Sequence, residues 1–250
     1  MKVLITGSKG FIGTHLMEYL SKKRYEVIGY DRIDGKEILD LTEKDIENVD
    51  CVVHLAGQTG VWNTNYKQIY NDNVKSFKHI LKLCKSLGKK FIYAGSSCSI
   101  NITSMYGITK RFQDIYAKKH FWYGCVGLRL HNVYGKDSRK DTLLGICLNN
   151  DEIVLYNNGQ NKRHFTYIDD VCRCIEKSFY FGGGFYNVYN PEENTVEEFV
   201  DEVSKYKSIV KIKINKKRKK DKKIQKVDKT ENLLEDSCDN IEEGIRNVFE

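Results

Sequence analysis

The chain has 250 residues, of which 40% are hydrophobic and 30% charged, enough for one well-packed domain or for one large domain with a small lobe. It contains no apolar run of about eighteen residues, which excludes a membrane-spanning helix, and no N-terminal leader pattern, so we expect a cytoplasmic protein. The formal net charge of +7 is local, because residues 211–223 hold nine Lys and Arg against the single acidic residue Asp221.

The first half of the chain alternates strand patterns with helical patterns. We predict strands at residues 2–6, 26–30, 49–55, 91–94 and 125–130, and helices at 11–22, 69–87 and 106–120. The run at 49–55 is continuous and apolar, as expected for a parallel strand covered on both faces. Repeated units of this kind predict an α/β fold, with a Rossmann-type doubly wound parallel sheet within residues 1–135.

The pattern loosens after about residue 134. We predict strands at 153–156 and 185–188, and helices at 168–180, 196–206 and 241–248. We interpret residues 136–250 mainly as a small C-terminal substrate-binding lobe, from which residues of about 153–180 return to the main sheet. The eight cysteines lie mostly in apolar stretches without metal-ligand or CxxC spacing, so we predict reduced, buried thiols and no metal site.

A glycine-rich loop follows the first strand and precedes the first helix. Gly7, Gly10 and Gly13 let the backbone turn tightly and approach a pyrophosphate, which the free N–H groups of the helix N-terminus can bind. Asp31 ends the second strand, where a carboxylate binds the adenosine ribose hydroxyls and repels a 2′-phosphate, although Arg32 follows directly and softens that preference. The pattern predicts NAD rather than NADP; the alternative is a purely structural turn.

Tyr106 and Lys110 lie four residues apart and therefore share one face of the predicted helix. We expect the ammonium, together with a positively charged nicotinamide, to lower the pKa of the phenol, so that Tyr106 acts as a base near neutral pH. A bare Tyr-x-x-x-Lys is common in surface helices. Here, however, the preceding strand ends in Ala94-Gly95-Ser96-Ser97, and a hydroxyl there can bond the reacting oxygen. We predict Tyr106 and Lys110 as a catalytic pair assisted by one of these hydroxyls.

Together these patterns resemble the extended short-chain dehydrogenase/reductase family, in its branch of nucleotide-sugar epimerases and dehydratases. The segments that carry the resemblance are 6–13, 54–57, 96–97, 106–110, 129–135 and 163–170, so it covers nearly the whole chain. The resemblance implies NAD as cofactor, a nucleotide-sugar substrate, and a homodimer formed through the helices at 69–87 and 106–120. It implies that Ser96 completes the catalytic group with Tyr106 and Lys110. It also extends the predicted cofactor site to Phe11, Ile12, Asp40, Leu41, Leu55, Ala56, Gly57 and Asn73.

The resemblance also narrows the reaction. Dehydratases of the family carry Asp-Glu after the catalytic Ser or Thr, whereas this chain has Ser97 and Cys98, so we do not expect a 4,6-dehydratase. Segments 54–61 and 156–170 are most similar to UDP-glucuronate 4-epimerases and their relatives, which implies epimerisation at C4 of a UDP-hexose or UDP-hexuronate through a 4-keto intermediate. Trp62 and Asn132 replace the usual Arg and Thr of that subgroup, so the acid substrate stays open. The substrate residues implied are Ser97, Cys98, Asn132, Arg139, Arg163 and Arg218.

Two alternatives remain at this point. Residues 95–98 resemble the Gly-Ser-Ser-Cys of GDP-fucose synthases, which are reductases and 3,5-epimerases that pair this cysteine with a histidine; no histidine lies between His131 and His164. The stretch from Ser96 to Tyr106 is shorter than in most relatives, so a degenerate NAD-binding regulatory protein is the second alternative.

The basic segment 211–223 has no interleaved aromatic residues on which bases could stack, so we expect no nucleic-acid partner. Arg218 and Asp221 have the spacing of an Arg-Pro-Gly-Asp element of the family, which implies that Arg218 contacts the nucleotide diphosphate.

Overall fold

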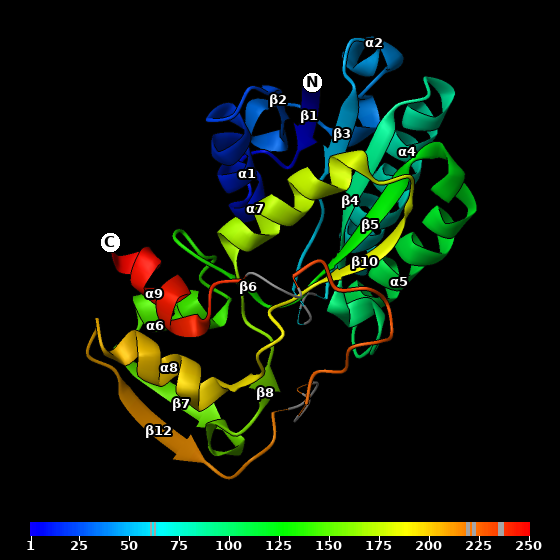
Figure 1. Cartoon of the computed structure of the whole chain (residues 1–250). Helices are drawn as coiled ribbons and strands as arrows, with labels where there is room; N and C mark the ends of the chain where they lie inside the picture. The colour runs from blue at the N-terminus through cyan, green and yellow to red at the C-terminus, as the bar shows by residue number, and fades with distance from the viewer. Residues whose placement is uncertain (61, 63, 219–220, 222–223, 235–237) are drawn as a thin grey trace.

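A computed structural model describes residues 1–60, 62, 64–218, 221, 224–234 and 238–250. Its central sheet has six strands in the order β10-β5-β4-β3-β1-β2, and every neighbouring pair is parallel (Figure 1). The strand order reverses at β1, which is the Rossmann-type doubly wound topology, and the predicted fold class is confirmed. The strands are β1 (Lys2–Thr6), β2 (Glu26–Tyr30), β3 (Cys51–His54), β4 (Lys90–Ser96), β5 (Cys125–Leu130) and β10 (Gly184–Val188).

Helices cover both faces of the sheet, because the strands present apolar side chains to both faces. Val3 and Ile5 pack in one core cluster with the apolar stripes of α1 (Phe11–Ser21) and α7 (Ile168–Lys177). Leu4 lies in the other cluster, with α4 (Ser76–Ser86) and the end of α5 (Met105–Ala117). Shorter helical segments near this sheet are η1 (Arg32–Asp34), η2 (Ile38–Asp40), α2 (Glu43–Ile46), α3 (Tyr66–Tyr70), the π-helical turn η3 (Asn71–Lys75), η4 (Ser97–Ser99) and η5 (Lys118–Tyr123).

A smaller lobe lies beyond the carboxyl ends of the strands (Figure 1). Its sheet pairs β7 (Glu152–Tyr156) with β12 (Val210–Ile214) in parallel. Two short pairs, β8 (Lys162–Arg163) with β11 (Asn194–Thr195) and β6 (Val133–Tyr134) with β9 (Thr166–Tyr167), connect it to the main body. The remaining elements here are α6 (Leu143–Asn149), η6 (Asn157–Gly159), α8 (Val196–Ser204) and α9 (Ile241–Phe249), whereas η7 (Ser178–Tyr180) follows α7 and packs on β4 in the main body.

Part of the predicted return of residues of about 153–180 reaches the main body, since α7 packs on α1. β7 stays in the lobe, where it pairs with β12, a strand that we did not predict. β10, which follows the predicted range, pairs with β5 at the edge of the main sheet.

Residues 224–234 run back from the lobe to the edge of the main sheet (Figure 1). The Asn187 N–H on β10 donates to the Glu231 carbonyl at 2.7 Å, and the Leu233 N–H donates to the Asn187 carbonyl at 3.0 Å. We call residues 224–234 the return segment. Throughout the described ranges, no helix combines the length and the apolar character needed to cross a membrane.

Candidate active site

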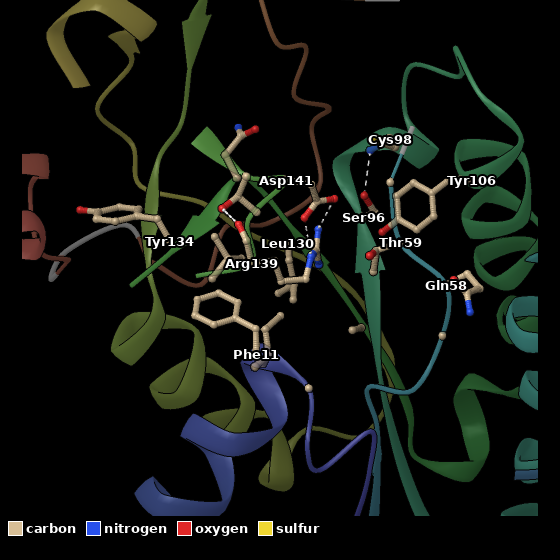
Figure 2. Close-up of a pocket in the computed structure, with 18 of the residues that line it drawn as sticks. Phe11, Gln58, Thr59, Ser96, Cys98, Tyr106, Leu130, Tyr134, Arg139 and Asp141 are labelled. Carbon is tan, nitrogen blue, oxygen red and sulfur yellow. Dashed lines mark hydrogen bonds and ion pairs between the residues drawn. The ribbon is translucent and has the colours of Figure 1, made fainter. Parts of the chain in front are cut away.

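A cleft of about 930 Å³ lies where the strands of the main sheet end and the lobe begins. Every residue predicted for catalysis, cofactor or substrate lines this cleft except Asp40, Leu41 and Asn73. Figure 2 shows Ser96, Cys98 and Tyr106 on one side of the cleft, and Phe11 and Arg139 across from them. The position fits the rule that open parallel sheets bind ligands at the carboxyl ends of their strands, where the strand order reverses.

The three exceptions have identifiable reasons. Leu41 is 1% exposed and belongs to the hydrophobic core, and Asp40 is exposed beside it, so η2 presents Ile38 and Leu39 to the cleft instead. Asn73 is fully buried behind the cleft wall. It supports the wall from behind, since its side chain accepts from the Gln58 N–H at 2.7 Å and donates to the Thr109 hydroxyl on α5 at 3.0 Å.

The glycine loop has the geometry that a bound pyrophosphate requires. Gly7 has φ +71°, and a Cβ at Gly13 would lie 2.0 Å from the Gly7 carbonyl oxygen, so the helix packs against the loop only because Gly13 has no side chain. Gly10 is the N-cap residue of α1, and no side chain forms a capping hydrogen bond there. The first N–H groups of this helix therefore remain available on a cleft-lining segment, which suits the diphosphate of NAD.

Asp31 lies in the part of the cleft that we predict for the adenosine ribose. Its carboxylate is 8% exposed and accepts from the Lys9 N–H at 2.9 Å and from the Ile33 N–H at 3.0 Å. These two bonds fix the carboxylate at the end of β2, where it can meet ribose hydroxyls.

The predicted catalytic group comes together at the ends of β4 and α5. The Ser104 hydroxyl caps α5 by accepting from the Gly107 N–H at 3.2 Å, which places Tyr106 in the first helical turn. The Ser96 hydroxyl is a hydrogen-bond partner of the Tyr106 phenol. The Lys110 ammonium lies 5.8 Å from the centroid of the Tyr106 ring.

We expected the Lys110 ammonium to contribute to a lowered pKa of the Tyr106 phenol, and Lys110 alone does not lower it. Burial, followed by the nearby Cys98, raises the pKa of Tyr106 to about 12, while the Ser96 hydroxyl and the Arg139 guanidinium lower it. The Lys110 ammonium lies over the Tyr106 ring and donates to the Ala94 carbonyl at 2.7 Å. Burial also lowers the pKa of Lys110 to about 8.

The sugar end of the cleft contains a contact that we did not predict. The Gln225 amide, on the return segment, donates to the Ser97 hydroxyl at 2.7 Å and accepts from the Asn132 amide. Gln225 thus bridges two predicted substrate residues. No local pattern singles it out, because the return segment has no helix or strand periodicity. Nearby, the Arg139 guanidinium donates to Asp141 at 3.0 Å (Figure 2).

The predicted phosphate contact, Arg218, is held by aromatic rings. Its guanidinium carbon lies 4.6 Å from the centroid of the Trp62 ring and 5.7 Å from that of Tyr156. Arg163 is paired with Asp221. Of the other basic residues in segment 211–223, Lys211 and Lys213 form ion pairs on the lobe, whereas Lys219, Lys220, Lys222 and Lys223 lie outside the described residues.

A buried network of polar side chains supports α5. The Asp114 carboxylate accepts from the Tyr93 hydroxyl at 3.1 Å, from the Ser99 hydroxyl at 2.7 Å and from the Arg129 Nε at 2.9 Å. Arg129 also reaches Asp228 on the return segment at 2.5 Å. The network links β4, β5 and the return segment to the helix that carries Tyr106, so it holds the predicted catalytic group in place.

Comparison with known proteins was consistent with this site. The family model of the NAD dependent epimerase/dehydratase family matches residues 3–188. Protein CapI of Staphylococcus aureus is 31% identical over 229 residues, which cover 71% of this chain and 69% of CapI. The uncharacterized UDP-glucose epimerase YtcB of Bacillus subtilis is 29% identical over 226 residues, covering 70% of this chain and 71% of YtcB. The UDP-glucuronic acid 4-epimerase of Bacillus cereus, solved with UDP-glucuronic acid and NAD, has the same fold, with a TM-score of 0.82 at 23% identity over 100% of this chain and 98% of that one.

Proposed function

Since the chain belongs to the NAD-dependent epimerase/dehydratase family, whose members are enzymes, we propose that it epimerises a nucleotide-diphosphate sugar at C4, with a UDP-hexose or a UDP-hexuronate as substrate. The observation that carries the proposal is the Tyr106 phenol in the cleft, with the Ser96 hydroxyl as its partner and Lys110 one helical turn away. The names of the relatives, a UDP-glucose epimerase and a UDP-glucuronic acid 4-epimerase, support the same substrate class.

In the proposed reaction NAD, when bound, supplies the chemistry of accepting a hydride from the sugar and returning it. The glycine loop binds its diphosphate and Asp31 its ribose. Tyr106 takes the proton of the C4 hydroxyl, and the Ser96 hydroxyl donates a hydrogen bond to the same oxygen. The 4-keto sugar turns over in the cleft, after which Tyr106 returns the proton to the oxygen at C4. Close positioning of these groups supplies much of the rate.

Arg218 is proposed to bind the diphosphate of the sugar nucleotide. It lines the cleft, and its guanidinium is held over the Trp62 ring, so that its position is fixed before the ligand arrives.

The reductase and 3,5-epimerase alternative rests on Cys98, which lines the cleft beside Tyr106. Such chemistry needs an acid and a base on opposite faces of the sugar. Burial raises the pKa of the Cys98 thiol, and the described residues that line the cleft include no histidine to act with it. C4 epimerisation, which needs only Tyr106 and its neighbours, is therefore the better-supported reaction.

Two copies of the chain are proposed to pair through α4 and α5. Ile108 and Ile115 on α5 are 50% and 57% exposed, which leaves apolar surface for a second copy to cover. Sedimentation at several protein concentrations tests this point separately from activity.

The experiment is a panel of UDP-, GDP- and dTDP-sugars incubated with NAD, with the sugar products separated by chromatography. We expect the wild type to convert one UDP-sugar to its C4 epimer, and Tyr106→Phe to form no product while still binding NAD. Tyr116→Phe is the matched control, because Tyr116 lies on the same helix outside the cleft and should keep full activity. Wild-type turnover by Tyr106→Phe, or conversion of no sugar by the wild type, would contradict the proposal.

A further inference from the structure

Arg32 follows the ribose-binding Asp31 and lines the cofactor end of the cleft, but its guanidinium is already bound. Its Nη2 lies 3.1 Å from an Asp72 carboxylate oxygen and 3.3 Å from a Glu37 carboxylate oxygen. A guanidinium in this place could instead bind the 2′-phosphate that distinguishes NADP from NAD, because its planar fork fits phosphate oxygens well. The partners of Arg32 therefore bear on which cofactor the cleft accepts.

Asp72 is the better fixed of the two carboxylates. Its side chain is 15% exposed, whereas that of Glu37 is 55% exposed. The second Asp72 oxygen accepts from the Gln58 side-chain amide at 2.9 Å, so both oxygens are occupied. An ion pair whose carboxylate is partly buried and hydrogen-bonded through both oxygens is screened less by solvent than an exposed ion pair.

The backbone around Asp72 explains its orientation. Asp72 lies in the π-helical turn η3 between α3 and α4. Such turns are uncommon, and they occur often at functional sites, because one extra residue in the turn changes the direction of the side chains. Here Asp72 reaches Arg32 and Gln58 while the next residue, Asn73, binds the Gln58 backbone.

We propose that Asp72 is a cofactor-specificity residue: by holding Arg32 in an ion pair, it withholds this guanidinium from a 2′-phosphate and so favours NAD over NADP. This discrimination against NADP adds to the repulsion of a 2′-phosphate by the Asp31 carboxylate. Even if the Asp31 carboxylate were removed, a 2′-phosphate that reached Arg32 would have to approach the Asp72 carboxylate as well, and like charges at such distances repel. Lys36 also lines this end of the cleft and stays in place in every variant below.

The test measures binding of NAD⁺ and NADP⁺ by titration calorimetry on nucleotide-free protein, so it does not depend on which sugar is turned over. Asp31→Asn alone removes one of the two carboxylates that repel a 2′-phosphate, and its NADP⁺ affinity is the baseline for the comparison. Asp31→Asn with Asp72→Asn should bind NADP⁺ about tenfold more tightly than Asp31→Asn alone, the effect of one additional charge-assisted hydrogen bond. Asp72→Asn alone should keep the NAD⁺ affinity of the wild type, because the Asn oxygen still accepts from Gln58.

Two further variants serve as controls. Glu37→Gln removes the same charge from the exposed partner of Arg32, and in the Asp31→Asn background it should give a clearly smaller gain than Asp72→Asn. Adding Arg32→Leu to the double variant should abolish the gain. Asp72→Ser, which also keeps an acceptor for Gln58, replaces Asp72→Asn if the latter does not fold. NADP⁺ affinity unchanged by the loss of the Asp72 charge, or a gain that survives Arg32→Leu, would overturn the proposal.

Discussion

Arg129→Met tests the buried network that supports the catalytic helix. The Arg129 side chain is 6% exposed and bonds Asp114, whose side chain is 3% exposed, as well as Asp228 on the return segment. Methionine has a similar reach and no charge, so the substitution removes the cation from two carboxylates while leaving most of the packing in place.

The expected loss follows from what each carboxylate retains. Asp114 keeps the neutral Tyr93 and Ser99 hydroxyls at 3.1 and 2.7 Å, which do not balance its charge. Removing one partner of a buried ion pair costs about 3–5 kcal/mol. The Asp228 side chain is 34% exposed, so the loss of its ion pair with Arg129 adds little to the fall in the free energy of unfolding. We therefore expect the free energy of unfolding to fall by about 3–5 kcal/mol, a large share of the roughly 5–15 kcal/mol of a typical protein.

The assay is urea unfolding followed by circular dichroism. Arg246→Met is the matched control, because the partner Glu250 lies 3.8 Å away and both side chains are exposed; it should change the free energy by less than about 0.5 kcal/mol. Combining Arg129→Met with Asp114→Asn should recover part of the loss, since no unpaired charge remains buried. A loss below about 1 kcal/mol for Arg129→Met, with an unchanged denaturant slope, would refute this reasoning.

Two further predictions concern the cleft. Because the Arg139 charge lowers the pKa of Tyr106, Arg139→Met should raise that pKa and move the acid limb of the kcat/KM profile to higher pH; a limb that stays in place would speak against this electrostatic effect. Trp62→Ala removes the ring that holds Arg218, so KM for the sugar nucleotide should rise about two- to fivefold with kcat unchanged, and Trp62→Phe should restore most of the affinity. A change in kcat without a change in KM would exclude this positioning role for Trp62.

The main sheet could be predicted because its signals are local. The continuous apolar run around Cys51–His54, for instance, is buried on both faces of a parallel strand, and it forms β3. The glycine loop with Asp31, and Tyr106 with Lys110, are likewise read from short spacings, and they line one cleft because parallel strands end at one edge.

What could not be predicted depends on residues far apart in the chain. Gln225 meets Ser97 across 128 positions and Asp228 meets Arg129 across 99, so neither pair leaves a periodic pattern. The direction of the Tyr106 pKa shift could not be predicted for a similar reason. The spacing shows Lys110 on the same helix face, whereas burial by the rest of the structure is the larger effect and raises the pKa.

The return segment also bears on how the protein folds and how it avoids aggregation. β10 is an outer strand of the sheet, and an uncovered outer strand can pair with another chain and start aggregation. Here the bonds between Asn187 and residues 231 and 233 occupy part of that edge. Because this cover comes from residues that follow β10 by more than forty positions, it forms only after most of the chain has been synthesised. Until then, the return segment leaves this edge of β10 uncovered.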